Sequence, residues 1–139
     1  MLGELRAVHS SERSYGKGGN FDLNRDKGQS AMSIDIANVK IREASHPVVR
    51  VHPQTGRKLL FVNPNSTQRF DDMNVEESRP ILDFLYAHQR RPEFTCCFRW
   101  EEHSVAFWDN RCTQHLAVND YDGLRRRMHR VTVDGDRPV

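Results

Sequence analysis

The chain has 139 residues, of which 37% are hydrophobic and 29% are charged, and its formal net charge is +2. This length fits one domain with a modest core, and the small net charge argues against nucleic-acid binding. No apolar run approaches the length needed to span a membrane, and the N-terminus lacks the apolar region of a signal peptide, so we expect no membrane association. The three cysteines give no disulfide framework, which favours a reducing, cytoplasmic setting.

The first third of the chain divides into three segments by composition. Residues 1–14 begin with a short helical pattern of Leu2, Leu5 and Val8, and we expect a helix followed by a loop. Residues 15–31 are rich in Gly, Asn, Asp and Lys without any period, which predicts a flexible loop or insertion, more readily a solvated linker than a lid. Residues 32–42 alternate apolar and polar side chains and predict the first strand of a domain that we expect to span 32–139.

A hairpin is predicted over residues 48–62. Three valines around residue 50 form one strand, residues 52–56 (HPQTG) supply turn chemistry, and residues 58–62 form the returning strand. His46 and His52 each stand beside a proline at a strand edge, and we interpret both as structural residues. Residues 63–70 predict a loop.

One helix is clearly signalled. Asn74 followed three residues later by Glu77 predicts a capping box, whereas Pro80 predicts an irregular first turn, with the helix resuming at Ser78. Pro92 predicts the end of the helix. Its expected buried face comprises Ile81, Leu82, Phe84, Leu85 and His88.

The C-terminal third has the patterning of short strands separated by turns. Strands are predicted over residues 94–100, 105–109, 112–118 and 125–133, with turns at 101–104 and 119–123. His115 falls near the middle of one strand. Arg126 and Arg130 share one face of the next, about 13 Å apart at roughly 3.3 Å per residue. A histidine beside a cationic strand suits a metal site that binds an anionic co-substrate, although a lone strand histidine and a solvated edge of arginines are the commoner explanations from spacing alone.

Three long motifs add a resemblance to these patterns. They are HPVVRVHPQTGRKLLFVN (residues 46–63), WDNRCTQHLAVNDY (residues 108–121) and RRRMHRVTVDGDRP (residues 125–138). In this order they resemble the C-terminal half of the taurine dioxygenase (TauD/TfdA) family of Fe(II)- and 2-oxoglutarate-dependent oxygenases. The resemblance implies a mostly β fold with one main helix, forming the C-terminal half of a double-stranded β-helix, or jelly roll.

The same resemblance assigns roles to three residues. His115 matches the distal histidine of the family's iron-binding 2-His-1-carboxylate triad, and Arg126 matches the arginine that holds the far carboxylate of 2-oxoglutarate. Arg130 matches the arginine that binds the substrate's sulfonate in taurine-oxidising members. Ser66 stands where those members place an aromatic residue, which argues against taurine as the substrate.

The sequence departs from the family in its iron ligands. The family takes the other two ligands from a His-x-Asp or His-x-Glu motif, but none of the seven histidines here is followed two positions later by an acid. We therefore interpret the chain as the C-terminal part of an oxygenase, which would need an N-terminal half to act on a small anionic substrate such as a sulfonate, sulfate ester or carboxylate. Three alternatives remain: a non-catalytic fragment or pseudoenzyme, one half of a split oxygenase, and a basic module that binds phosphate through residues 125–130.

Overall fold

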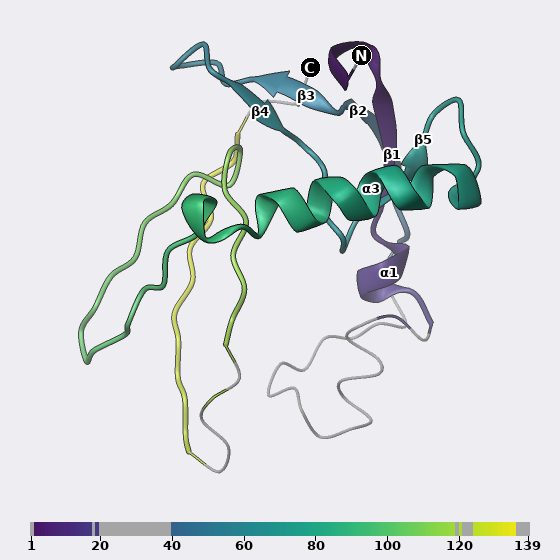
Figure 1. Ribbon diagram of the computed structural model, residues 1–139. Coiled ribbons are helices and arrows are strands. Elements are labelled where there is room, and N and C mark those ends of the chain that lie inside the picture. Colours follow the sequence, from purple (N-terminus) through teal and green to yellow (C-terminus); the bar gives the residue numbers. More distant parts are fainter. Residues whose placement is uncertain (1, 18, 20–39, 119, 121–123, 136–139) are drawn as a thin grey trace.

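A computed structural model describes residues 2–17, 19, 40–118, 120 and 124–135. Its regular elements comprise short strands and one main helix, as the sequence analysis expected (Figure 1). The strands are β1 (Arg6–Ser10), β2 (Glu43–Pro47), β3 (Val49–Val51), β4 (Lys58–Leu60) and β5 (Thr67–Phe70). The main helix is α3 (Val75–Gln89), accompanied by the short helix α1 (Glu12–Tyr15) and the 3-10 turns Leu2–Glu4 and Pro92–Phe94. Within the described residues, no helix is both long and apolar enough to cross a membrane.

A three-stranded antiparallel sheet is formed in the order β2-β1-β5. The central strand β1 corrects the expectation of a helix within residues 1–14. Hydrogen-bonded neighbours on both edges and the full burial of Ala7 outweigh a weak helical spacing of three apolar residues. The loop expected over residues 63–70 is also partly wrong, since Thr67 and Phe70 are buried in β5.

The predicted hairpin is confirmed as the antiparallel pair β3–β4, in which Arg50 lies opposite Leu59. Gly56 adopts a φ of +67° in the connecting turn, a conformation that glycine adopts without the cost borne by other residues. The turn is closed by the amide of Gly56, which donates to the carbonyl of His52 at 2.9 Å.

Helix α3 begins at the predicted capping box. The Asn74 side chain accepts from the Glu77 amide at 2.9 Å, and the Glu77 carboxylate accepts from the Asn74 amide at 2.8 Å. The irregular first turn expected from Pro80 is absent, and the helix runs through it. Proline lacks an N–H and so leaves the carbonyl of Glu76 without that donor, but this carbonyl lies on the exposed first turn, where water can reach it.

The face that α3 buries differs in part from the expected one. Leu82 and Leu85 are buried as predicted, whereas Phe84 is 66% exposed and Tyr86 takes a buried position. Tyr86 is held there because its hydroxyl donates to the carbonyl of Thr67 in β5 at 3.3 Å. The core between helix and sheet is formed by Ala7, Val48, Val62, Phe70, Leu82, Leu85 and Tyr86.

The predicted strands of the C-terminal third do not form within its described residues. Residues 95–118 and 124–135 run largely outside the sheet and helix as extended traces, parts of which return to the β3–β4 hairpin (Figure 1), and they carry no regular secondary structure where they are described. The turn expected at residues 101–104 is present, with His103 at a φ of 65° and the Ser104 amide bonded to the Glu101 carbonyl. A strand is stabilised by backbone pairing with a neighbouring strand, and these segments form no strand pairing among the described residues. Their apolar side chains stay in solvent, including Phe107 at 95% and Leu116 at 89% exposure.

Candidate functional site

The three residues proposed from the resemblance all lie in these extended segments. His115, Arg126 and Arg130 are exposed, and the surface depression seen between α1 and β5 lies elsewhere, against Arg13 and Pro64. The His115 ring contacts the Trp108 indole, with ring centroids 5.1 Å apart. None of the three residues lines this depression.

The segment just before His115 has a defined local geometry centred on Asp109. Residues 109–112 form a turn in which the amides of Cys112 and Thr113 both donate to the Asp109 carbonyl. The Asp109 carboxylate accepts from the backbone amide of Arg111 at 2.8 Å and from its guanidinium, with Nη2 2.6 Å from Oδ2. The hydrogen bonds from Arg111 make the largest contribution, together with one from His52, to holding the pKa of Asp109 well below its usual range. This carboxylate is therefore charged at neutral pH.

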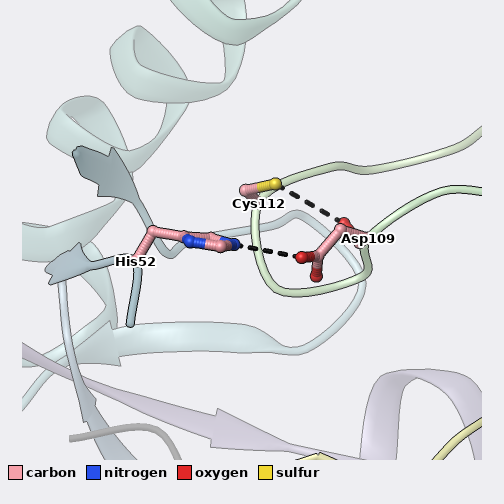
Figure 2. A group of neighbouring side chains, drawn as sticks. All are labelled: His52, Asp109 and Cys112. Carbon is pink, nitrogen blue, oxygen red and sulfur yellow. Dashed lines mark hydrogen bonds and ion pairs between the residues drawn. The ribbon is translucent and has the colours of Figure 1, made fainter. Parts of the chain in front are cut away.

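Two contacts anchor this segment to the body of the protein. Nε2 of His52, at the end of β3, lies 3.0 Å from Oδ2 of Asp109 (Figure 2). Gln114, five residues after Asp109, makes the second contact: its side chain donates to the carbonyl of Val62 at 2.8 Å. The side chain of Gln89 in α3 donates to the same carbonyl at 3.1 Å. These contacts agree with the interpretation of His52 as a structural residue, but its partners were not predicted. The sequence showed only a histidine at the start of a turn, and nothing near it pointed to Asp109, which lies 57 positions away.

A second polar cluster lies on the three-stranded sheet around His9. Its ring stacks on Phe61 with centroids 5.5 Å apart and meets His46 edge-on at 5.2 Å. Ser66 Oγ and Thr67 Oγ1 lie 3.3 Å and 3.4 Å from its two ring nitrogens. Burial of the ring and the nearby His46 lower the pKa of His9 to about 4. Ser66, which the sequence analysis placed at the substrate side of the family site, thus contacts a histidine that is neutral at physiological pH.

An iron centre of the family type needs three protein ligands, two nitrogen donors and one carboxylate. Among the described residues, the His, Cys, Asp and Glu side chains that come close enough to share a metal are His52, Asp109 and Cys112, and His115 is not among them. His115 therefore belongs to no described group of three such side chains. The described residues do not supply the three ligands of a complete iron site.

Comparison with known proteins decides the family. The sequence profile of the Taurine catabolism dioxygenase TauD, TfdA family matches residues 1–132. The chain belongs to this family. Among its relatives, an alpha-ketoglutarate-dependent sulfate ester dioxygenase of Pseudomonas putida is 36% identical over 139 residues, covering 100% of this chain and 45% of that protein. An alpha-ketoglutarate-dependent sulfonate dioxygenase of Saccharomyces cerevisiae is 38% identical over 141 residues, covering 100% of this chain and 31% of that protein.

The fold comparison agrees with the sequence comparison. The crystal structure of a taurine dioxygenase from Burkholderia xenovorans superposes with a TM-score of 0.56 at 33% identity, over 80% of this chain and 30% of that one. The chain thus spans less than half the length of the curated family members that it resembles.

Proposed function

We propose that this chain is the C-terminal part of an Fe(II)- and 2-oxoglutarate-dependent dioxygenase of the taurine dioxygenase type. The observation that carries the proposal is the family match over residues 1–132, together with relatives whose names specify dependence on alpha-ketoglutarate. In this proposal His115 supplies one iron ligand, Arg126 binds the distal carboxylate of 2-oxoglutarate, and Arg130 binds an anionic group of the substrate.

The chemistry of the two arginines supports their part in the proposal. A guanidinium is always charged and forms paired hydrogen bonds with a carboxylate, sulfonate or sulfate. In an extended strand Arg126 and Arg130 would share a face, about 13 Å apart along the chain, which is farther than one small dicarboxylate requires. Relatives named for sulfate esters and sulfonates make these anions the first substrates to test.

The C-terminal segments, which pair with no described strand, support a jelly roll that is completed by a further part of the polypeptide. Val105, Phe107, Leu116 and Val131 are each at least 86% exposed. Exposed apolar side chains on extended backbone are a surface that another strand or layer can cover. The proposal therefore includes an N-terminal half that pairs with these segments and brings the remaining iron ligands.

A non-catalytic role is the second candidate. It is favoured by one specific observation: no histidine is followed two positions later by an acid, and His115 belongs to no group of three possible metal ligands among the described residues. A fragment or pseudoenzyme would keep the fold of the family and its anion-binding arginines without turnover.

The two candidates are separated by complementation. The chain is fused behind the preceding part of the Pseudomonas putida sulfate ester dioxygenase, and succinate is measured with Fe(II), 2-oxoglutarate and an alkyl sulfate. We expect turnover that His115→Ala abolishes, and none from the chain alone, because a single imidazole cannot hold iron against water. A fusion that binds 2-oxoglutarate but forms no succinate would support the non-catalytic candidate. Succinate formed by the unfused chain would show that it is not a partial enzyme.

A further inference from the structure

The residues that anchor the segment before His115 have a chemistry of their own. His52 is 7% exposed, and its two ring nitrogens have different partners. The Thr55 amide donates to Nδ1 at 3.3 Å, and Nε2 faces the Asp109 carboxylate at 3.0 Å. Because Nδ1 accepts a hydrogen bond it carries no proton, so the neutral ring has its proton on Nε2. His52 is therefore a donor to a charged carboxylate.

This tautomer determines whether His52, Asp109 and Cys112 can bind a metal ion together. Their possible ligand atoms lie within 4.8 Å of one another. A metal ion at Nε2 would need the lone pair of that nitrogen, which is occupied by the proton as long as Thr55 donates to Nδ1. The Asp109 oxygens are also engaged by the guanidinium of Arg111. Figure 2 thus shows a charge-assisted hydrogen bond between two distant parts of the chain rather than three free metal ligands.

The second anchor sets the direction of His115. Gln114 turns toward the body, where its amide donates to the Val62 carbonyl. Val62 is fully buried and belongs to the core under α3, so its carbonyl is a fixed point. In extended chain, successive side chains point to opposite sides. A Gln114 side chain held against the body therefore directs the neighbouring His115 away from it, toward the side on which a partner strand would pack.

We infer that His52, Asp109 and Gln114 are positioning residues, which clamp residues 109–114 to the hairpin and helix and thereby aim His115. The importance of that aim for catalysis rests on the proposed function, but the clamp itself does not. The Nε2–H of His52 donates to the Asp109 carboxylate, and Asp109 also organises the turn over residues 109–112. Gln114, which directly precedes the candidate ligand His115, fixes the backbone at that point.

A matched pair of substitutions isolates the donor at His52. Glutamine places an N–H close to the position of Nε2, whereas asparagine reaches only as far as Nδ1, and both remove the ring. Backbone order parameters of the full chain are measured by ¹⁵N relaxation. We expect a rigid backbone at His115, with an order parameter of about 0.8, in the native chain and in His52→Gln, and a value below roughly 0.6 in His52→Asn. Residues of α3 should not change.

Gln114→Ala provides the same test at an exposed position, where folding is not at risk. It should loosen His115 as His52→Asn does, while Gln54→Ala, in the exposed hairpin turn, should not. Equal order parameters at His115 in His52→Gln and His52→Asn, or no change in Gln114→Ala, would overturn the clamp. In the fused enzyme, His52→Asn should lower kcat about tenfold more than His52→Gln without changing the KM for 2-oxoglutarate. A fusion without any activity would count against the proposed function alone, since the order parameters decide the clamp independently.

Discussion

The ring of His9 meets the ring of His46 edge-on, with centroids 5.2 Å apart, while its face lies on Phe61. The two histidines come from β1 and β2, which are paired strands of the same sheet. Two imidazoles this close cannot both carry a charge without repulsion, and the aromatic face beneath His9 replaces water. The sheet therefore contains a histidine that folding keeps neutral.

Acid should destabilise the fold through His9. The pKa of His9 falls from 6.5 to about 4 on folding, so the unfolded chain binds the proton more readily than the native chain. The contribution of His9 to stability is complete above pH 6.5 and is lost progressively as the pH falls from 6.5 to about 4. Because the ring is partly exposed, we expect a loss of roughly 1–2 kcal/mol in the free energy of unfolding, less than the full shift would imply. Urea denaturation at a series of pH values measures it.

Two variants control for other titrating groups. His9→Gln should flatten the pH dependence between 6.5 and 4, and His103→Gln, whose side chain is 90% exposed, should leave it intact. The Asp109 carboxylate does not interfere, because its lowered pKa makes its contribution disappear only below about pH 4. If the profile of His9→Gln matches that of the native chain in this window, the titration belongs to another group.

Two apolar residues of α3 should differ sharply in their effect on stability. Leu82 is 2% exposed and Phe84 is 66% exposed. Leu82→Ala leaves a cavity in the core and should cost about 2–5 kcal/mol, whereas Phe84→Ala removes a mostly solvated ring and should cost about 0.5 kcal/mol or less. Thermal or urea unfolding compares them. A cost for Phe84→Ala as large as that for Leu82→Ala would mean that α3 buries the face originally expected from its sequence.

The capping box should make a measurable contribution at the start of the same helix. Asn74→Ala removes the acceptor for the Glu77 amide and should destabilise the fold by about 1 kcal/mol. Asn74→Asp is the matched control, since it keeps the acceptor oxygen and suits the positive end of the helix. Equal stabilities of the alanine and aspartate variants would assign no energy to the cap.

The features that could be predicted from the sequence are those determined by residues close together in the chain. The capping box of Asn74 and Glu77 and the hairpin around Gly56 arise from residues within a few positions of one another, and both are confirmed. Strand β1 was missed because its cause is pairing with β2 and β5, whose paired residues lie 33–41 and 58–63 positions further along the chain. The contact between His52 and Asp109 was missed for the same reason. The strands predicted after Phe94 have suitable side chains but no described partner, and pattern alone does not pair them.

The roles of Arg126 and Arg130 should separate in the fused enzyme. If Arg126 holds 2-oxoglutarate and Arg130 holds the substrate anion, each substitution weakens a different ligand. Arg126→Ala should raise the KM for 2-oxoglutarate and spare that for the alkyl sulfate, and Arg130→Ala should do the reverse. Each loss should match a charge-assisted paired contact, about 1.5–3 kcal/mol, or roughly ten- to 150-fold in KM. Steady-state kinetics with each ligand varied in turn provides the measurement.

Arg125→Ala and Arg127→Ala are the controls for this pair. They lie on the same run of arginines but on the opposite face of an extended strand, so they should change neither KM by more than a few-fold. Comparable effects of all four substitutions on both ligands would show one diffuse cationic patch, in which surface charge attracts any anion. Such an effect should also fade with added salt, because exposed charges are screened beyond about 10 Å at 0.1 M ionic strength, whereas a paired guanidinium contact inside a closed site should persist.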